Sequence, residues 1–120
     1  MLWGSVILPC GDRIRVLIAT SPAELQAGLK GQRPDADEGM LFVYPKSQLS
    51  SFWMHGVDVP LDIIWISQGS RITHIVHQAR PCPGVPCPKY QSAIPAQYVL
   101  ELQGGQASKH GLCVGQAVRL

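Results

Sequence analysis

Two carboxylates and one guanidinium are the side chains whose types and positions best suit chemistry in this sequence: Asp62, Glu101 and Arg33. Asp62 lies in an apolar segment, where the alternation of a strand puts it on the same face as Ile64 and Ile66. A buried carboxylate without a partner is too costly to hold. An arginine can satisfy it with two parallel hydrogen bonds. We therefore expect Arg33 to pair with Asp62.

Three interpretations of Arg33, Asp62 and Glu101 are possible, and the sequence leaves all three open. The favoured one is structural: the pair fixes the loop after the helix to the sheet. In the second, the pair lines a cleft and binds a polar ligand or holds a reacting group. In the third, Asp62 and Glu101 are the two carboxylates of a glycoside hydrolase, which need a separation of about 5 to 9.5 Å. Two carboxylates on different strands are common by chance, so the third ranks lowest.

The histidines and serines add no catalytic or metal site by their spacing. His74 and His77 are three residues apart on an expected strand, and residues at that spacing point to opposite faces. His55 and His110 stand alone in the sequence, and no Gly-x-Ser-x-Gly motif is present. We therefore expect no catalytic residue, no metal site and no cofactor.

Two of the four cysteines are close enough in sequence to form a disulfide. Cys82 and Cys87 lie inside Pro81–Pro88, a segment with four prolines and one glycine. Rigid turns there can bring the two sulfur atoms together, although unrelated free thiols are the alternative. A bridge between Cys10 and Cys113 is less favoured. An even number of cysteines in a small chain mildly favours an oxidising compartment.

Large apolar side chains gather in Phe52-Trp53-Met54 and recur at Trp65. Such residues usually belong to the core of a small β domain, but Trp53 and Tyr90 could instead stack on a sugar or a small apolar ligand. The candidate ligand-binding residues are Arg33, Trp53, Met54, His55, Asp62, Tyr90 and Glu101.

One helix start is clear in the sequence. Ser21 can cap a helix, Pro22 suits its first position, and Glu24 completes a capping box three residues after the cap. We expect a helix of about two turns that ends at Gly28 or Gly31.

The rest of the chain alternates short apolar segments with turn formers, a pattern typical of strands. The expected strands are 14–19, 39–44, 52–57, 61–67, 71–78 and 98–102, with 1–10 as an edge strand and 117–120 able to close the set. This rhythm predicts a mainly β chain, a barrel or sandwich of about six to eight strands with one short helix near residues 21–30. The gaps 30–38 and 79–97 are the natural places for a site or a flap.

Composition narrows the class of protein further. The chain has 120 residues, of which 46% are hydrophobic, enough for the core of one domain. Only 15% of residues are charged, the net charge is +2 and no Lys/Arg-rich run exists, which argues against a nucleic-acid partner. No apolar stretch approaches the roughly 18 residues of a transmembrane helix. The N-terminal residues lack the basic start of an export signal.

Four segments occur in an order that is specific in combination: Gly39-Met40-Leu41-Phe42-Val43, Phe52-Trp53-Met54, Pro60-Leu61-Asp62-Ile63 and Tyr98-Val99-Leu100-Glu101-Leu102. Together with Ala19-Thr20 and Gly28-Leu29…Arg33 upstream, they make residues 12 to 120 resemble the domain of unknown function 192 family, also called uncharacterised protein family 0127. The resemblance implies a compact, jelly-roll-like β-barrel of prokaryotic origin, often found with export signals, and no established activity. After Met54 the family usually continues Lys-Asn-Thr, whereas this chain has His55-Gly56-Val57.

We predict a single domain over residues 1–120 that acts as a non-catalytic, extracytoplasmic binding module. Its partner is expected to be a small molecule or a protein, bound at the end where the 79–97 loop lies. The alternative is a small hydrolase or other acid–base enzyme centred on Asp62, Arg33 and Glu101. The two differ physically: an enzyme needs a reachable carboxyl group with a raised pKa, whereas a structural pair needs Asp62 sealed and charged.

Overall fold

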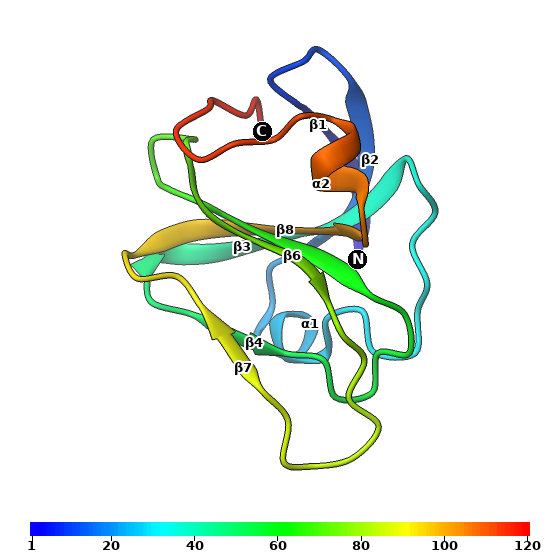
Figure 1. The fold of residues 1–120 in the computed structure, drawn as a ribbon. Helices are drawn as coiled ribbons and strands as arrows, with labels where there is room; N and C mark the ends of the chain where they lie inside the picture. Colours follow the sequence, from blue (N-terminus) through cyan, green and yellow to red (C-terminus); the bar gives the residue numbers. More distant parts are fainter.

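A six-stranded mixed sheet forms the centre of the molecule in the computed structural model, which covers residues 1–120. The elements in chain order are β1 (Leu2–Ile7), β2 (Arg13–Ala19), α1 (Pro22–Ala27), β3 (Glu38–Gln48), β4 (Ser51–Trp53), β5 (Leu61–Ile66), β6 (Ile72–Ala79), β7 (Lys89–Gln91), β8 (Ala96–Gln103) and α2 (Gln106–Lys109). The sheet order is β1-β2-β3-β8-β5-β6, and β4 pairs with β7 in a separate two-stranded sheet (Figure 1). Only the β2–β3 pair is parallel.

Both faces of the main sheet are apolar and covered. On one face, α1 and the β4–β7 pair lie below the sheet in Figure 1, over a core that includes Phe42, Trp65 and Val99. On the other face lie α2 and the C-terminal segment, over a core that includes Ile64 and Leu100. The side chains of β5 and β8 alternate between these two cores, which is why β5 is buried along its whole length.

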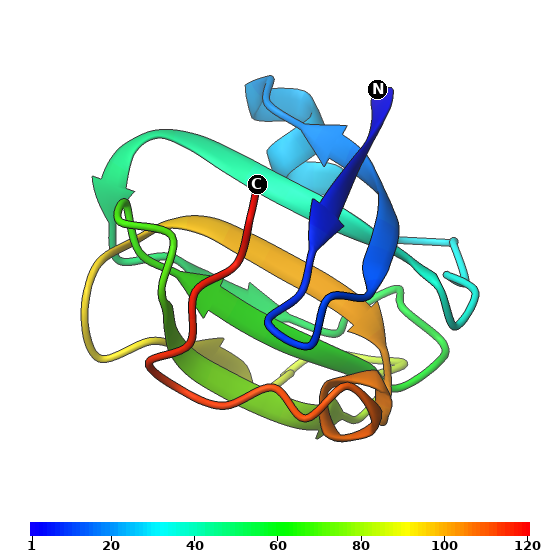
Figure 2. The same cartoon turned by 90° about the horizontal axis from the view of Figure 1, so that it is seen from above.

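The strand ladders do not close into the barrel that we expected. The edge strands β1 and β6 are joined only through the C-terminal segment, which runs between them in Figure 2. Ile7 forms an isolated bridge with Arg119, and Arg71 forms one with Ala117. Residues 117–120 therefore occupy the closing position predicted for them, but as isolated bridges and not as a strand.

The predicted helix is confirmed, and a second one is present. In α1 the Ser21 hydroxyl accepts a hydrogen bond from the Glu24 amide, and the Glu24 carboxylate accepts from the amides of Thr20 and Ser21. These backbone bonds lower the pKa of Glu24 to about 2. The second helix, α2, has four residues and begins after Gly105 without a side-chain cap, so the sequence carries no local signal for it.

The strand predictions hold for every main-sheet strand except at the ends. The edge strand at the N-terminus is confirmed as β1, and β3 and β8 both extend beyond the predicted 39–44 and 98–102. The strand expected at 52–57 is shorter, because β4 ends at Trp53. The gap 79–97 contains one unpredicted strand, β7, which pairs with β4.

Candidate functional site

A cavity of about 240 Å³ lies between α1 and the face of the sheet that α1 covers. The turn after α1, the strands β3 and β4, and the segment after β4 form its walls, and Glu101 of β8 lines it from the sheet. The charged and aromatic side chains in its lining are Lys30, Phe42, Tyr44, Phe52, Trp53, His55 and Glu101.

One part of the cavity wall is aromatic. Phe52 packs edge-on against Phe42, with ring centroids 5.0 Å apart, and Trp53 packs against His55 at 5.1 Å. Phe42 is 1% exposed, whereas Trp53 is 44% exposed. The aromatic lining therefore runs from the core out to the solvent, where it can meet an incoming ligand.

Glu101 is the unusual group in this cavity. It pairs across the sheet with Met40 on β3 and Ile63 on β5, and it is 4% exposed. Its carboxyl group takes part in none of the side-chain hydrogen bonds or ion pairs of the structure. Burial raises the pKa of Glu101 to about 8, so the group carries a proton at pH 7.

Two neighbours of Glu101 explain how it is held there. Gly39 on β3 lies so close to the backbone carbonyl of Glu101 that a Cβ atom at this position would collide with it. Tyr44, farther along β3, lines the same cavity, and burial raises the pKa of its phenol. The glycine lets β3 and β8 approach closely, and Tyr44 adds a neutral phenol to the same cavity lining.

Asp62 does not pair with Arg33, which corrects the expectation from the sequence. Asp62 is fully buried on the opposite face of the sheet, where its carboxylate accepts hydrogen bonds from the backbone amides of Gln78 and Ala107, both at 2.7 Å. Gln78 has a positive φ of 50° beside an irregularity in the β5–β6 pairing, and Ala107 lies in α2. Asp62 therefore anchors α2 and the end of β6 to β5.

Arg33 lies on the surface. Its guanidinium pairs with Asp58 at 2.7 Å, and the two side chains are 69% and 61% exposed. Each partner stabilises the charge of the other, which raises the pKa of Arg33 and lowers that of Asp58. An ion pair this exposed adds little to stability. The three groups of the alternative enzyme site, Asp62, Arg33 and Glu101, are thus not brought together.

The remaining candidates lie at or next to the cavity. Trp53 and His55 line it together with Glu101, as three of the seven predicted residues. Met54 is 1% exposed and packs in the core beneath, and Tyr90 pairs with Phe52 across the β4–β7 ladder. Lys30, Phe42 and Tyr44 also line this cavity, and they were not among the residues predicted from the sequence. One sequence signal could have indicated this cavity. Leu25 and Leu29 form an apolar face on the predicted helix, and such a face must pack against a neighbouring strand.

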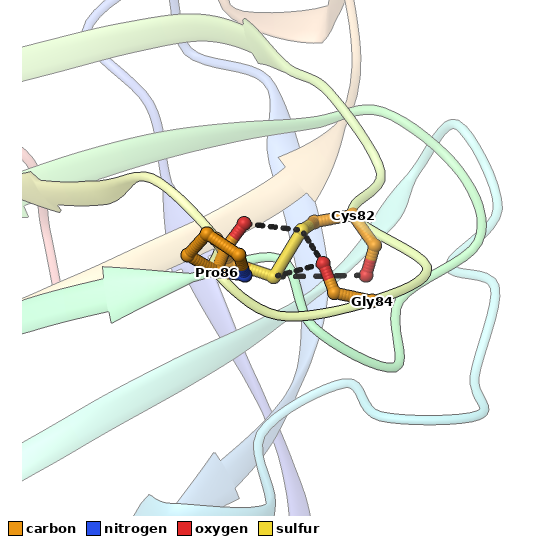
Figure 3. The surroundings of a disulfide bond; sticks show 4 residues. Cys82, Gly84 and Pro86 are labelled. Atoms are coloured by element: carbon orange, nitrogen blue, oxygen red, sulfur yellow. Dashed lines mark hydrogen bonds between the residues drawn. A yellow bond between two sulfur atoms is a disulfide. The ribbon is translucent and has the colours of Figure 1, made fainter.

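The proline-rich segment lies next to the cavity and carries the predicted disulfide geometry. The sulfur atoms of Cys82 and Cys87 lie at bonding distance, with Cα atoms 5.9 Å apart (Figure 3). The Cys82 amide donates to the Met54 carbonyl at 3.4 Å, which ties the loop to the segment after β4. Cys10 and Cys113 are free and exposed, so the less favoured bridge between them is absent.

Residues 6–120 match the DUF192 family, described as uncharacterized ACR, COG1430. The match covers nearly the whole chain and includes every helix and strand that lines the cavity. The chain belongs to the DUF192 family. The resemblance noted from the sequence is therefore confirmed.

Two solved structures are similar to this DUF192 chain. A protein of unknown function from Novosphingobium aromaticivorans DSM 12444 has a TM-score of 0.86 and 30% identity, over 97% of this chain and 82% of the other. A protein from Sinorhizobium meliloti 1021, described as a candidate transcription regulator, has a TM-score of 0.83 and 28% identity, over 95% and 88%. Among curated proteins, none matches the chain.

Two further features of this DUF192 chain bear on its site. His55 and Val57, which stand where the resemblance to the family implies Lys-Asn-Thr, line the cavity. Neither helix is long enough to cross a membrane, since α1 has six residues and α2 has four.

Proposed function

We propose that this DUF192 chain is a non-catalytic binding module of the extracytoplasmic space and that the Glu101 cavity binds a small organic amine. The observation that carries the proposal is a carboxyl group that is 4% exposed, has no protein partner and lines a cavity whose wall is partly aromatic. A buried polar group without a partner is costly in a folded protein. A ligand that supplies the missing hydrogen bonds removes that cost.

The chemistry of the cavity favours a cation over other ligands. An ammonium group donates hydrogen bonds to a carboxylate and gains a second attraction from the faces of aromatic rings. Phe42, Tyr44, Phe52 and Trp53 supply such rings in the cavity that Glu101 lines. Lys30, the one lysine or arginine in the lining, is exposed and forms no ion pair, so it is free to turn toward solvent. The volume of about 240 Å³ suits a ligand smaller than a typical drug.

Acid–base catalysis by Glu101 is the second candidate function. A carboxyl group whose pKa burial raises to about 8 can give or take a proton near neutral pH, and His55 lines the same cavity. The separation of Asp62 and Arg33 from this cavity removes the rest of the enzyme site considered from the sequence. Binding therefore explains more of the cavity than catalysis does.

The description of the Sinorhizobium meliloti neighbour raises DNA as a rival partner. A protein that binds DNA neutralises phosphates with clustered lysine and arginine side chains. This chain has ten basic and eight acidic side chains, and its basic residues form no run. We infer that the partner is a small molecule. Strongly salt-dependent binding to DNA would contradict this inference.

The extracytoplasmic location rests on the cysteines. Cys82 and Cys87 have disulfide geometry, and disulfides persist in oxidising compartments such as the periplasm. Fractionation of the native host with an antibody against the chain tests this part of the proposal. Recovery in the cytoplasm with all four thiols reduced would contradict it.

Benzylamine, benzyl alcohol and benzoate form a matched set of probes for the cavity, because they share a ring and differ in charge. We expect benzylammonium to bind best by calorimetry. Below pH 8 the ion must displace the proton of Glu101, so its affinity should rise about tenfold per pH unit. Glu101→Gln should abolish this pH dependence, whereas Glu38→Gln, which changes a half-buried glutamate paired with Arg15 outside the cavity lining, should leave it unchanged.

Three results would decide against amine binding. Equal affinity for benzyl alcohol would show that the ring alone is recognised. Tighter binding of benzoate, weakening as the pH rises, would show that the protonated Glu101 donates to an anion. Turnover of an ester or glycoside that Glu101→Gln abolishes and Glu38→Gln does not would favour the acid–base enzyme.

A further inference from the structure

A second group of reactive side chains lies on the opposite face of the sheet from the Glu101 cavity. Cys10 and Asp12 come from the turn between β1 and β2, and His110 comes from the end of α2. One potential ligand atom from each residue lies within 4.8 Å of the other two. Asp12 and His110 are in contact but lie 98 positions apart in the sequence. For this reason the sequence alone gave His110 no neighbouring ligand.

The distances in this group are close to those of a metal site. The Nδ1 atom of His110 lies 2.7 Å from the Oδ2 atom of Asp12, and the Cys10 thiol donates to the same oxygen at 3.3 Å. Zinc bonds of about 2.0 to 2.3 Å in a tetrahedron place neighbouring ligand atoms about 3.3 to 3.7 Å apart. Because all three ligand atoms lie within 4.8 Å of one another, side-chain movements of about 1 Å can bring them to these separations around an ion.

The backbone around the three residues is held in place. In the turn, the Leu8 amide donates to the Asp12 carbonyl and the Gly11 amide donates to the Leu8 carbonyl, both at 2.8 Å. Gly11 has a φ of 94°, which favours glycine. The side chain of His110 is 11% exposed and that of Asp12 is 59% exposed, so the group is anchored on its α2 side and open to solvent on the other.

The charge state of the group also suits a cation. The hydrogen bond from His110 lowers the pKa of Asp12, with smaller contributions from Cys10 and from the charge of Lys109. Asp12 is therefore ionised at neutral pH. Lys109 precedes His110 in sequence and is exposed, so its ammonium group can remain in solvent when a cation binds.

We propose that Cys10, Asp12 and His110 bind one divalent transition-metal ion of the zinc type. A thiolate, an imidazole nitrogen and a carboxylate oxygen form a mixed ligand set that zinc and cobalt accept. Calcium and magnesium prefer sites made of oxygen ligands alone. Three protein ligands leave a fourth position for water or an incoming group.

Cobalt(II) tests the site directly, because a cobalt–thiolate bond gives an intense near-ultraviolet charge-transfer band. The full chain is titrated under argon with its Cys82–Cys87 pair oxidised. We expect the band to saturate at one ion per chain and to be displaced by zinc. Cys10→Ser should remove the band, while Cys113→Ser, which changes the other free and exposed cysteine, should keep it.

Thermal unfolding gives an independent measurement of the same site. Zinc should raise the Tm of the unmodified chain and of Cys113→Ser, and raise it much less in Cys10→Ser and His110→Gln, because an ion that binds only the folded chain stabilises it. Calcium should have no effect. The proposal is overturned if the cobalt band is absent, or if it survives in Cys10→Ser. Neither outcome depends on whether the Glu101 cavity binds an amine.

Discussion

At the scale of single residues, two buried carboxyl groups on neighbouring strands have opposite surroundings. Asp62 on β5 faces the core under α2, where two backbone amides satisfy its charge. Glu101 on β8 faces the other core and has no such partners, and burial raises its pKa to about 8. A shift of one position along a strand changes the face, so the same sheet supports a structural carboxylate and a candidate functional one.

Replacement of Asp62 tests the structural role. In Asp62→Ala the amides of Gln78 and Ala107 lose their acceptor in the core, and each orphaned group costs about 1–3 kcal/mol. We expect a loss of about 2–4 kcal/mol in the free energy of unfolding, measured by urea denaturation. Asp58→Ala, which removes an exposed ion pair with Arg33, should cost about 0–1 kcal/mol. Equal effects of the two changes would contradict the anchoring role of Asp62.

At the scale of elements, what could be predicted depended on whether the signal was local. The capping residues Ser21 and Glu24 are three positions apart, so α1 could be located from the sequence. The start of α2 depends on Asp62, 45 positions away, and β7 exists because it pairs with β4. Contacts between residues so far apart in the sequence produce no local pattern from which a helix or strand could be predicted. The partner of Arg33 was misassigned for the same reason, because a buried carboxylate can be satisfied by the backbone as well as by a cation.

The proline-rich loop permits a test at this scale. The pair Cys82–Cys87 closes a loop of only a few residues, so its loss should cost less than the roughly 3 kcal/mol expected for a 15-residue loop. We expect Cys82→Ser/Cys87→Ser to fold and to lose about 2 kcal/mol or less in urea denaturation. Alkylation without reductant, followed by mass spectrometry, should block Cys10 and Cys113 alone. Four alkylated cysteines in protein from an oxidising compartment would contradict the bridge.

At the scale of the whole molecule, the sheet separates two candidate sites that differ in chemistry. The Glu101 cavity opens on the α1 side, and the Cys10 group lies on the α2 side. The mainly β class and most strand positions followed from the alternation of apolar residues. The assembly of either site did not, because Glu101 shares a cavity with Tyr44, and Cys10 lies near His110, only after the chain has folded.

The buried Glu101 should make the stability of the whole molecule depend on pH. Its pKa is about 8 in the folded chain, against an ordinary value of 4.5 for a glutamate in water. Between these values the folded chain holds a proton that the unfolded chain has released, so stability falls as the pH rises. The stabilisation that the protonated Glu101 gives to the folded chain is fully present below pH 4.5 and is lost by about pH 8. Its upper limit is about 5 kcal/mol in the free energy of unfolding.

Glu101→Gln isolates this contribution, because the amide does not titrate. Urea denaturation from pH 5 to pH 9 should show the variant gaining stability relative to the unmodified chain as the pH rises. The difference should level off above about pH 8. A difference that stays constant with pH would show that Glu101 is ionised and compensated throughout the range.

The C-terminal segment has a consequence for how these molecules meet one another. An open sheet exposes unpaired backbone groups along its outer strands, where a second molecule can add a strand and begin an aggregate. Here the amide and carbonyl of Ile7 at the end of β1 are occupied by Arg119, and the amide and carbonyl of Ile72 at the start of β6 are occupied by Gln116 and Gly115. By pairing with these backbone groups, the segment disfavours edge-to-edge polymerisation at one end of each outer strand.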